Sequence, residues 1–252
     1  MTFILLLISL DISGHDLSRN RHQFSIGPEG YYVRRLKEGG TKQKGGIYGG
    51  RFSYDRFKRY ALYWGAEFAG DYGTLHGHSG SGSALRSHLT DYSAEGRFGY
   101  TIQQKECSKI SFTPFIGGGY FVEKNNFVNP TLIHAHFRTR YAYFTAGFFL
   151  WGLVCDQFEL GLNLKAKYPY EPKCYVSHDA DSEPVTQKIR THTQYRVEVP
   201  LTYRITCDGQ FALSMIPVYE YRNYGSHPNF PFDFFKTQFN CWGLTLEFLY
   251  RI

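Results

Sequence analysis

The sequence predicts an all-β protein that folds as an up-and-down antiparallel barrel of ten strands. Three observations predict this fold. Apolar and polar residues alternate with a period of two over long segments, which is the periodicity of a strand with two unlike faces. Aromatic residues make up 18% of the 252 residues and there are 26 glycines, yet mean hydropathy is only −0.37. Finally, short and long connections follow one another along the chain, as in a barrel whose hairpins turn alternately at two rims.

The end of the sequence shows the alternation most clearly. One face of this segment is apolar and comprises Trp242, Leu244, Leu246, Phe248, Tyr250 and Ile252. The opposite face carries Gly243, Thr245, Glu247 and Arg251. This ending resembles the closing strand of bacterial outer-membrane β-barrels, which has alternating apolar residues and an aromatic residue near its end, although here Ile252 rather than Phe is last. The resemblance implies a transmembrane barrel in the bacterial outer membrane, with outer-membrane lipid around it.

The same periodicity defines ten candidate strands in chain order. They are expected near residues 22–36, 45–57, 60–72, 88–103, 110–124, 136–153, 158–170, 190–206, 211–225 and 236–252. Gly27, Pro28 and Gly30 weaken the first of them. Tight links are expected at 56–59, 104–109, 154–157 and 207–210, and long loops at 37–44, 74–87, 125–133, 171–189 and 225–235. In an up-and-down barrel these two groups lie on opposite rims, which predicts short periplasmic turns and long external loops.

Strand length and the placement of charge favour a membrane barrel. A tilted strand crosses the hydrocarbon core with about 9–11 residues, and most of the candidates supply at least that many. Charged residues stay on one parity of each strand, as Lys165 and Lys167 do opposite Leu164 and Ala166. Because a Lys or Arg on a lipid-facing surface costs about 2–4 kcal/mol at mid-bilayer, the charged parity is expected to face inward. A soluble ten-stranded lipid-binding barrel is the rival fold.

The inward parity predicts a charged lumen. Its expected members are Glu29, Arg51, Asp55, Glu67, Asp91, Glu95, Arg97, Glu159, Lys165, Lys167, Arg196, Glu198, Arg204, Glu220, Arg222, Glu247 and Arg251, with Asp71 on the same parity. A ten-stranded barrel is close to the eight-stranded size that side chains fill. Long side chains of both signs in so narrow a bore are expected to pair across it and to plug it. An open lumen, and hence a small-solute channel, is the alternative.

Two further features of the sequence concern export and nucleic-acid binding. Residues 1–14 are similar to the apolar core of a secretion signal, without Lys or Arg ahead of it, and predict a truncated signal peptide before a barrel spanning 22–252. A buried first strand is the alternative for this segment. The net charge is +6, but the basic residues are spread singly along the chain, so nucleic-acid binding is not expected.

The sequence offers weak candidates for catalysis. Omptin proteases are ten-stranded outer-membrane barrels with Asp and His groups at the external rim. The residues comparable here are Asp71, His88, Asp91, His136 and His192, and they do not match that family's pattern position by position. Ser87 with His88 is a weak candidate for a lipid-modifying barrel. We therefore expect no enzyme and no cofactor.

Two other motifs have plain explanations. His76 and His78 lie in a Gly- and Ser-rich segment without a third metal ligand nearby, so no metal site is expected. Gly117 to Gly119 are not followed by a helix and are expected to allow strand bending or aromatic packing.

The five cysteines are an odd number for an exported protein. Cys107, Cys155 and Cys207 fall in three successive short links, Cys174 in a predicted long loop, and Cys241 near the top of the last strand. Successive turns on one rim are about 10 Å apart, which exceeds the reach of a disulfide. We therefore expect Cys107, Cys155 and Cys207 to cross-link the barrel to an envelope protein.

The function predicted from these features is a structural or surface-interaction role. The long external loops, above all 171–189, are expected to carry binding. A small-solute channel is the second hypothesis, and a membrane-embedded hydrolase or a soluble lipid carrier is less favoured.

Overall fold

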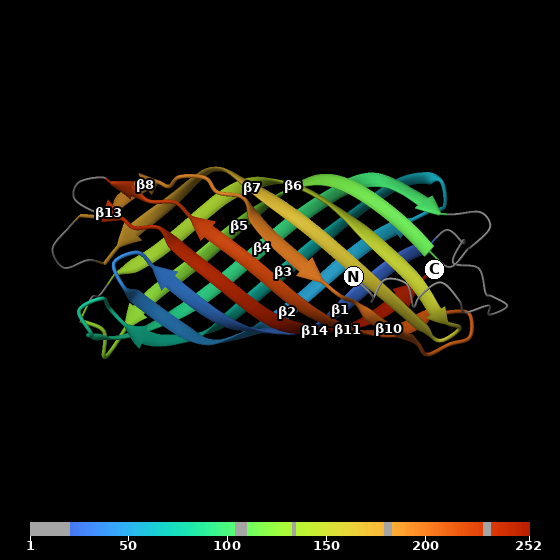
Figure 1. Cartoon of the computed structure of the whole chain (residues 1–252), viewed down its shortest axis with the longest axis horizontal. Coiled ribbons are helices and arrows are strands. Elements are labelled where there is room, and N and C mark those ends of the chain that lie inside the picture. The colour runs from blue at the N-terminus through green and yellow to red at the C-terminus, as the bar shows by residue number, and fades with distance from the viewer. Residues whose placement is uncertain (1–20, 104–109, 133–134, 179–182, 229–232) are drawn as a thin grey trace, which may run out of the picture.

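The long alternating segments form long strands. The computed structural model describes residues 21–103, 110–132, 135–178, 183–228 and 233–252, and Figure 1 shows their arrangement. Nine barrel strands are continuous: β1 (Arg21–Lys37), β2 (Thr41–Phe57), β3 (Ala61–His78), β4 (Ala84–Gln103), β5 (Ile110–Val128), β6 (His136–Cys155), β7 (Phe158–Ser177), β11 (Phe211–Tyr224) and β14 (Thr237–Arg251). The strand between β7 and β11 is divided into β8 (Val185–Lys188), β9 (Gln194–Glu198) and β10 (Leu201–Arg204). A two-stranded hairpin, β12 (His227–Pro228) and β13 (Asp233–Phe234), follows β11. The segment predicted as a signal peptide, 1–14, lies outside the described residues.

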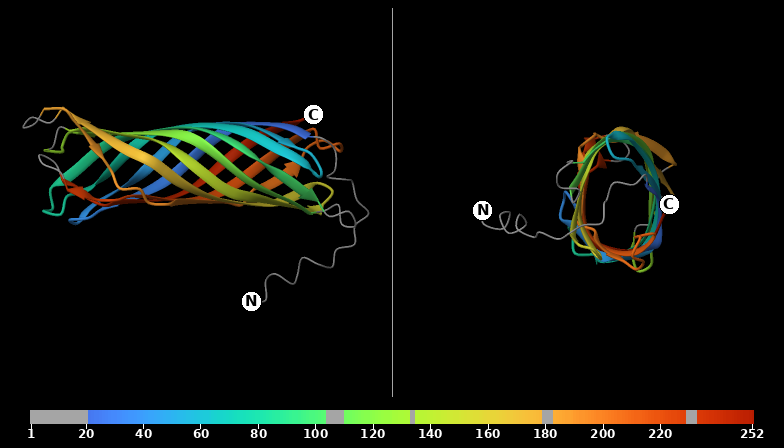
Figure 2. Two further views of the ribbon diagram at one scale, coloured as in Figure 1. Left: turned by 90° about the horizontal axis from the view of Figure 1, so that it is seen from above. Right: turned by 90° about the vertical axis from the view of Figure 1, so that its right-hand side faces the viewer.

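Neighbouring barrel strands pair antiparallel, except that β8 pairs with β7 alone, and β14 pairs with β1 to close the sheet. At the closure His22 and Ile252 exchange two backbone hydrogen bonds of 2.9 and 3.0 Å. Seen along the axis, the section is an oval (Figure 2). The predicted ten-stranded up-and-down barrel is confirmed. Among the residues that the structure describes, no helix is long and apolar enough to span a bilayer.

The two rims differ less than predicted. At one end, which we call the turn rim, strands are joined by 58–60, 156–157 and 205–210. At the other end, the loop rim, the connections are 38–40, 79–83, 129–135, 178–184 and the segment that contains β12 and β13. Most residues of the predicted long loops belong to strands instead: β7 continues to Ser177 and β8 begins at Val185, so 171–189 is largely strand. The predicted loops at 37–44, 74–87, 125–133 and 171–189 are therefore corrected to short connections between longer strands.

A level of outward-facing aromatic side chains divides the barrel wall. We call it the aromatic belt; its members are Tyr32, Tyr48, Tyr72, Tyr92, Tyr120, Tyr168, Tyr170, Tyr195, Tyr219 and Trp242. Tyr32 and Tyr219 both pair directly with Trp242, and Tyr48 pairs with Tyr72. Every barrel strand contributes except β6, which has Ala142 between Tyr120 and Tyr170. Such belts mark the interface between membrane and water in transmembrane barrels.

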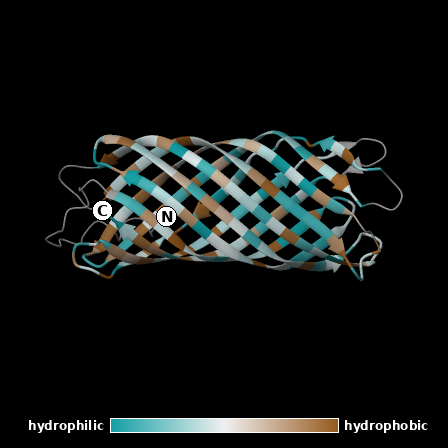
Figure 3. Ribbon diagram, turned by 180° about the vertical axis from the view of Figure 1, so that it is seen from behind, coloured by the Kyte–Doolittle hydropathy of each residue, from teal (hydrophilic) through white to brown (hydrophobic). Residues whose placement is uncertain are grey.

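The outer surface changes character at the aromatic belt. Between the belt and the turn rim lies the membrane half, whose outward residues are apolar and include Ile26, Phe52, Leu62, Phe68, Phe98, Ile116, Phe144, Leu213, Met215, Leu244, Leu246 and Phe248. Between the belt and the loop rim lies the outer half, whose outward residues are polar and include Arg34, Lys42, Lys44, His76, His78, Arg86, His88, Lys124, Arg138, Arg140, Lys173 and Lys188. Figure 3 shows hydrophobic and hydrophilic residues alternating along the strands. Trp64 and Trp242 are each 44% exposed on this apolar outer wall, and contiguous apolar surface of this extent is rare on soluble monomers.

The strands are longer than a membrane requires. Strands β4, β6 and β7 have 20 residues each, or about 66 Å at about 3.3 Å per residue. With a tilt of about 40°, such a strand rises about 50 Å, against an apolar band about 25 Å tall. About half of the barrel therefore projects beyond the apolar band on the side of the loop rim.

Gly119 shows why the glycine run on β5 is needed. A Cβ at Gly119 would lie 2.5 Å from the Tyr143 hydroxyl, because the tyrosine of the neighbouring strand crosses over it inside the barrel. The predicted role of Gly117 to Gly119 in aromatic packing agrees with this contact.

Candidate functional site: a filled lumen and a grooved outer wall

The structure places all the predicted lumen charges inside the barrel. Each is at most 7% exposed: Glu29, Arg51, Asp55, Glu67, Asp91, Glu95, Arg97, Glu159, Lys165, Lys167, Arg196, Glu198, Arg204, Glu220, Arg222, Glu247 and Arg251. Asp71 lies inside with them. The strand period alone brings these side chains to one surface, because successive residues point to opposite faces.

Ion pairs connect opposite walls of the lumen. The Lys165 ammonium on β7 lies 2.9 Å from Glu95 on β4 and 3.4 Å from Glu67 on β3. These two carboxylates are cross-strand partners, so the lysine offsets a like-charge contact on the far wall. The Arg222 guanidinium on β11 pairs with Asp91 on β4. The bore is thus narrow enough for side chains to meet across it.

The middle of the lumen holds a continuous network centred on two arginines. Arg51 lies 3.1 Å from Glu29 and 2.9 Å from Glu198. Arg196 lies 2.6 Å from Glu198 and 2.7 Å from Glu220. Arg196 and Arg51 also donate to the Tyr31 hydroxyl, at 2.9 and 3.2 Å. Sharing each acid between two cations satisfies the acceptor oxygens that a single pair would leave open.

Nearer the turn rim Glu159 joins two cations. The Arg204 Nε lies 2.5 Å from the Glu159 carboxylate, and Arg251 Nη2 lies 2.8 Å from it. Arg251 Nε donates to Gln23 at 2.9 Å. The penultimate residue therefore ties the closing strand to β7 across the interior.

Apolar layers lie at both ends of this network. Toward the turn rim, Tyr63, Phe115 and Phe149 form a buried cluster with Phe57 and Trp151 packed against it. Toward the loop rim lies a larger cluster that includes Val33, Ile47, Leu75, Leu89, Phe121, Tyr141, Tyr224 and Phe239. An interior cavity bordered by Arg51, Glu67 and Arg97 measures only about 40 Å³, which is the space of one or two waters. Side chains therefore fill this stretch of the lumen.

Sequence reasoning missed part of the interior. Arg35 and Glu123 are buried and face inward: Arg35 donates to Gln43 at 2.7 Å and Glu123 accepts from the Tyr224 hydroxyl at 3.0 Å. Their parity gave the signal, because Arg35 follows Glu29, Tyr31 and Val33 at steps of two. Inward tyrosines were missed as well, and only the closed barrel shows that Tyr31, Tyr63, Tyr141, Tyr143 and Tyr224 are buried.

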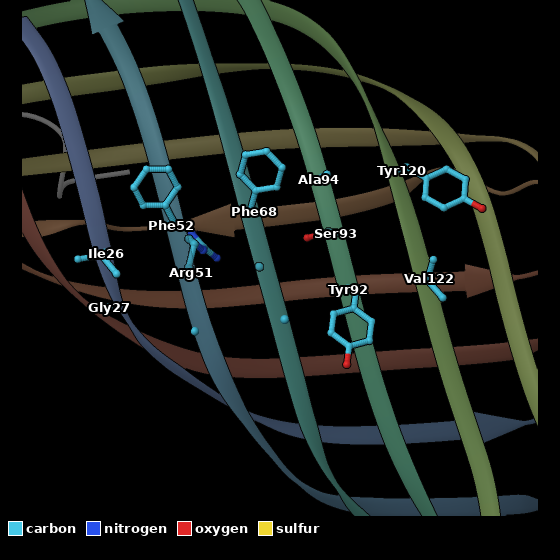
Figure 4. A pocket seen from close by; sticks show the side chains of 13 residues that line it. Ile26, Gly27, Arg51, Phe52, Phe68, Tyr92, Ser93, Ala94, Tyr120 and Val122 are labelled. Atoms are coloured by element: carbon cyan, nitrogen blue, oxygen red, sulfur yellow. The ribbon is translucent and has the colours of Figure 1, made fainter.

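The outer wall carries a hollow that the sequence did not reveal, which we call the wall groove. It crosses β1 to β5, has a volume of about 580 Å³, and is lined by Ile26, Gly27, Gly50, Arg51, Phe52, Phe68, Ala69, Gly70, Tyr92, Ser93, Ala94, Tyr120 and Val122. Figure 4 shows rings from neighbouring strands bordering it. Gly50 and Gly70, which are direct cross-strand partners, leave its floor low. Only the register brings these small residues together.

The candidates for catalysis are not brought together. Ser87 is buried in the lumen and accepts from Gln43 at 3.0 Å, while the adjacent His88 faces outward against Tyr72 and Thr74. Ser87 and His88 thus lie on opposite faces of β4 and cannot act as a pair. Of the residues compared with omptins, Asp71 and Asp91 are partners inside the barrel, His136 stacks on His178 at the loop rim, and His192 is exposed.

The histidine motif and the cysteines are placed as follows. His76 and His78 are exposed on the end of β3, not in a loop, and the described residues contain no group of three or more metal-ligating side chains. Cys174 lies in β7 and is buried, so its predicted loop position is wrong. Cys155 is half-buried, Cys207 is exposed in the 205–210 turn, and Cys241 is buried on β14. Cys107 lies outside the described residues.

Comparisons with known proteins support the class of fold. No protein-family model matches the chain, and none of the curated proteins matches it. Among solved structures, the outer membrane protease OmpT of Escherichia coli is similar over 95% of this chain and 99% of its own, with 12% identity and a TM-score of 0.58. The translocator domain of the autotransporter NalP from Neisseria meningitidis covers 96% of this chain and 91% of its own at 9% identity and a TM-score of 0.49. The attachment invasion locus protein Ail of Yersinia pestis, in complex with a heparin analogue, covers 92% and 99% at 12% identity and a TM-score of 0.40.

The chain therefore has the fold of the bacterial outer-membrane β-barrels. At 12% identity the likeness to OmpT shows the fold alone.

Proposed function

We propose that this chain is a closed barrel of the bacterial outer membrane that acts through its outer surface and loop rim, not as a conduit. The single observation that carries this proposal is the filled lumen, in which ion pairs such as Lys165 to Glu95 and Arg222 to Asp91 cross the bore. A conducting pore needs a continuous water path, and porins obtain one with about sixteen or more strands.

The electrostatics of the interior support a closed state. Of the predicted lumen charges that lie inside, ten are acids, Asp71 included, and eight are bases, so the two signs nearly balance. Balanced charges that neutralise one another give no ring of one sign to select a permeating ion. Breaking one of these pairs to let a solute pass would leave a buried charge without its partner, which is strongly unfavourable.

The outer surface of the barrel supports the proposed outer-membrane location. An apolar band with an aromatic belt along one edge, inward charges and closed strands is the arrangement expected of an outer-membrane barrel. The likeness to OmpT over 95% of the chain supports the same location.

The surface proposed for interaction is the outer half with its loop rim. Strand ends and the β12–β13 hairpin contribute to this rim, so partners would meet the ends of β7 and β8 over most of the segment predicted as a long loop at 171–189. At the opposite rim we retain the proposal that Cys155 and Cys207, with Cys107, bond to an envelope protein; Cys207 is exposed there.

Single-channel recording tests the closed lumen. The protein is refolded, its folding is checked by a heat-dependent shift on a denaturing gel, and it is inserted into a planar bilayer. We expect a folded, inserted protein without unitary openings. Steady and reproducible openings would reject the closed lumen and make the small-solute channel the leading function.

The expectation that the chain is not an enzyme stays a prediction. Its fold is shared with a protease, and the candidate residues Ser87 and His88 face away from each other. Incubation of the refolded protein with a mixed peptide library and with phospholipid, followed by mass spectrometry, is expected to show no cleavage. A product that disappears in a His88→Ala variant would contradict the prediction.

A further inference from the structure

Basic residues that are scattered in the sequence converge on one part of the outer wall. Lys124 on β5, Arg138 and Arg140 on β6, Lys173 on β7 and Lys188 on β8 all lie in the outer half. The register makes them neighbours: Lys124 pairs with Arg138, Arg140 pairs with Lys173, and Lys173 pairs with Lys188. We call these five residues the basic patch.

The basic patch places like charges directly opposite one another. Such pairs destabilise a sheet unless another charge offsets them. Within the part of the chain that the structure describes, none of the five makes an ion pair. The nearby acid is Glu171, at the irregularity where β6 and β7 shift register beside Arg140, and one carboxylate does not balance five cations. This arrangement calls for an anion from outside the chain.

The basic patch adjoins the upper end of the wall groove. Val122 lines the groove and is the cross-strand partner of Arg140. Tyr92 also lines the groove, and the Lys124 ammonium lies over its ring at 5.8 Å. From this end the groove crosses the strands to Phe52 and Ile26 in the membrane half, as the labelled side chains of Figure 4 show. The apolar wall groove and the basic patch thus form one continuous surface.

We propose that this surface binds one phosphorylated acyl lipid, with its phosphate on the basic patch and an acyl chain in the wall groove. Arginine guanidinium groups bind phosphate oxygens in pairs of parallel hydrogen bonds, and lysines add charge. The groove spans five strands, or about 19 Å at about 4.8 Å per strand, which accommodates a chain from one leaflet about 15 Å deep. Its floor is at the glycines Gly50 and Gly70, so a chain can lie against the backbone between the rings of Phe52, Phe68 and Tyr92.

A membrane lipid fits better than a free anion or an acidic protein segment. The cations stand just above the aromatic belt, at the level where lipid headgroups meet water. A free phosphate would make no contact with the groove, because the lining of the groove is almost entirely apolar. The proposal rests on the membrane location proposed above, but not on the closed lumen, so a conducting barrel would leave it intact.

The test uses the full chain refolded in detergent and transferred to phosphatidylcholine nanodiscs that contain either diphosphorylated lipid A or the same lipid after removal of its phosphates. Lipids that remain bound on release from the disc are counted by native mass spectrometry. We expect one phosphorylated lipid retained per barrel, and at least tenfold less retention of the dephosphorylated form. Equal retention of the two forms would overturn the proposal.

Matched variants locate the site. The triple variant Arg138→Gln, Arg140→Gln, Lys173→Gln removes three charges from the patch, and Arg56→Gln, Lys58→Gln, Arg59→Gln removes three at the turn rim. We expect at least tenfold weaker retention in the first and wild-type retention in the second, each checked for folding by its heat-dependent gel shift. Equal loss in both would mean that net charge alone attracts the lipid, which would also overturn the proposal.

The groove is tested separately with outward-facing glycines. Gly50→Leu places a side chain in the groove, where the nearest atom to an added Cβ is 3.5 Å away, whereas Gly96→Leu adds the same side chain at an open position outside the lining. Retention is expected to fall with Gly50→Leu only. Unchanged retention in Gly50→Leu would overturn the proposed binding of the acyl chain in the wall groove. Displacement of the bound lipid by millimolar inorganic phosphate would assign the patch to a free anion and overturn the lipid proposal.

Discussion

The two halves of the barrel have opposite polarity. In the membrane half, Leu244 and Leu246 face outward while Glu247 and Arg251 are buried inside. In the outer half of the same strand, Phe239 and Cys241 are buried inside while Asn240 faces outward. The exchange occurs at the aromatic belt, where Trp242 lies. One strand thus follows two rules, as the proposed location requires: its outer face would meet lipid below the belt and water above it.

Strand β2 repeats the exchange. Phe52 is outward and Arg51 and Asp55 are buried in the membrane half, whereas Ile47 is buried and Lys44 is outward above the belt. The outer half is therefore built like a soluble barrel stacked on a membrane barrel. Interior packing in the outer half comes mainly from apolar burial. In the membrane half it comes mainly from paired charges, with the cluster of Tyr63, Phe115 and Phe149 toward the turn rim. Paired charges contribute less net stability, but losing one partner is strongly destabilising.

The largest expected effect compares two lysines of one strand. Lys165→Met removes one of the two cations that contact Glu67 and Glu95, the other being Arg97. Two buried carboxylates opposite each other then share a single cation, and we expect a loss of about 3–5 kcal/mol in the free energy of unfolding. Lys173→Met, an outward position in the outer half, is expected to change it by no more than about 0.5 kcal/mol. Urea unfolding in lipid vesicles, followed by tryptophan fluorescence, measures both. Similar values for the two variants would break the distinction between the halves.

A charge placed on the outer wall probes the boundary at the belt. Leu246→Arg puts a cation on the lipid side of the membrane half and is expected to cost about 2–4 kcal/mol at mid-bilayer depth. Asn240→Arg puts it above the belt on the same strand face, where we expect a cost of about 0–1 kcal/mol. The same unfolding assay applies. If Asn240→Arg cost as much as Leu246→Arg, the belt would not mark the edge of the lipid.

Lys37, in the outer half, is expected to make the stability of the barrel depend on pH. It lies at the loop rim with its ammonium over the rings of Phe235 and Phe137, at 5.4 and 6.0 Å. Burial, with Arg35 adding to the effect, lowers the pKa of Lys37 to about 8, whereas an unfolded lysine has a pKa near 10.4. Between these values the unfolded chain binds more protons, so the wild type should gain stability relative to Lys37→Met as pH rises from about 8 to 10. A difference between the two proteins that is flat with pH would show that Lys37 is solvated.

Thiol labelling compares the accessibility of cysteines at the turn rim and in the interior. Its variant is expected to have the smallest effect on stability. Cys207 is exposed, and Cys174 and Cys241 are buried. In a Cys107→Ser background, a polar maleimide is expected to label Cys207 in the folded protein and the two buried thiols only after unfolding. Cys207→Ser should change stability by less than about 0.5 kcal/mol, and in intact cells it should weaken any disulfide-linked band on a non-reducing gel. A gel that shows only monomer for the wild type would count against the envelope partner.

The exchange of polarity also explains how far the sequence could be interpreted. In the membrane half one parity stays apolar for many residues, so strands, facing and the inward charges from Glu29 to Arg251 followed from the period of two. Above the belt the apolar parity changes sides, and the alternation breaks for a residue or two. Segments such as 74–78 and 171–177 then look irregular and were interpreted as loops, although they are strand.

The features of the outer wall could not be derived from local pattern at all. Lys124, Arg140 and Lys188 are far apart in the sequence, which is why the basic residues seemed dispersed, and only register makes them neighbours. The low floor of the wall groove likewise depends on Gly50 facing Gly70. Cross-strand pairing is set by closure of the whole barrel, which no window of sequence contains.

The divided strand between β7 and β11 has a consequence for how the barrel opens. Elsewhere longer ladders join neighbouring strands, but here β8, β9 and β10 are separated by 189–193 and 199–200, and Pro200 has no amide hydrogen to donate. Across the first gap, Arg190 and Gly225 form an isolated bridge. Fewer cooperative hydrogen bonds mean lower local stability and faster amide exchange. The barrel is therefore expected to open first at β8, β9 and β10. A strand from another chain would also insert into the wall most easily at this place.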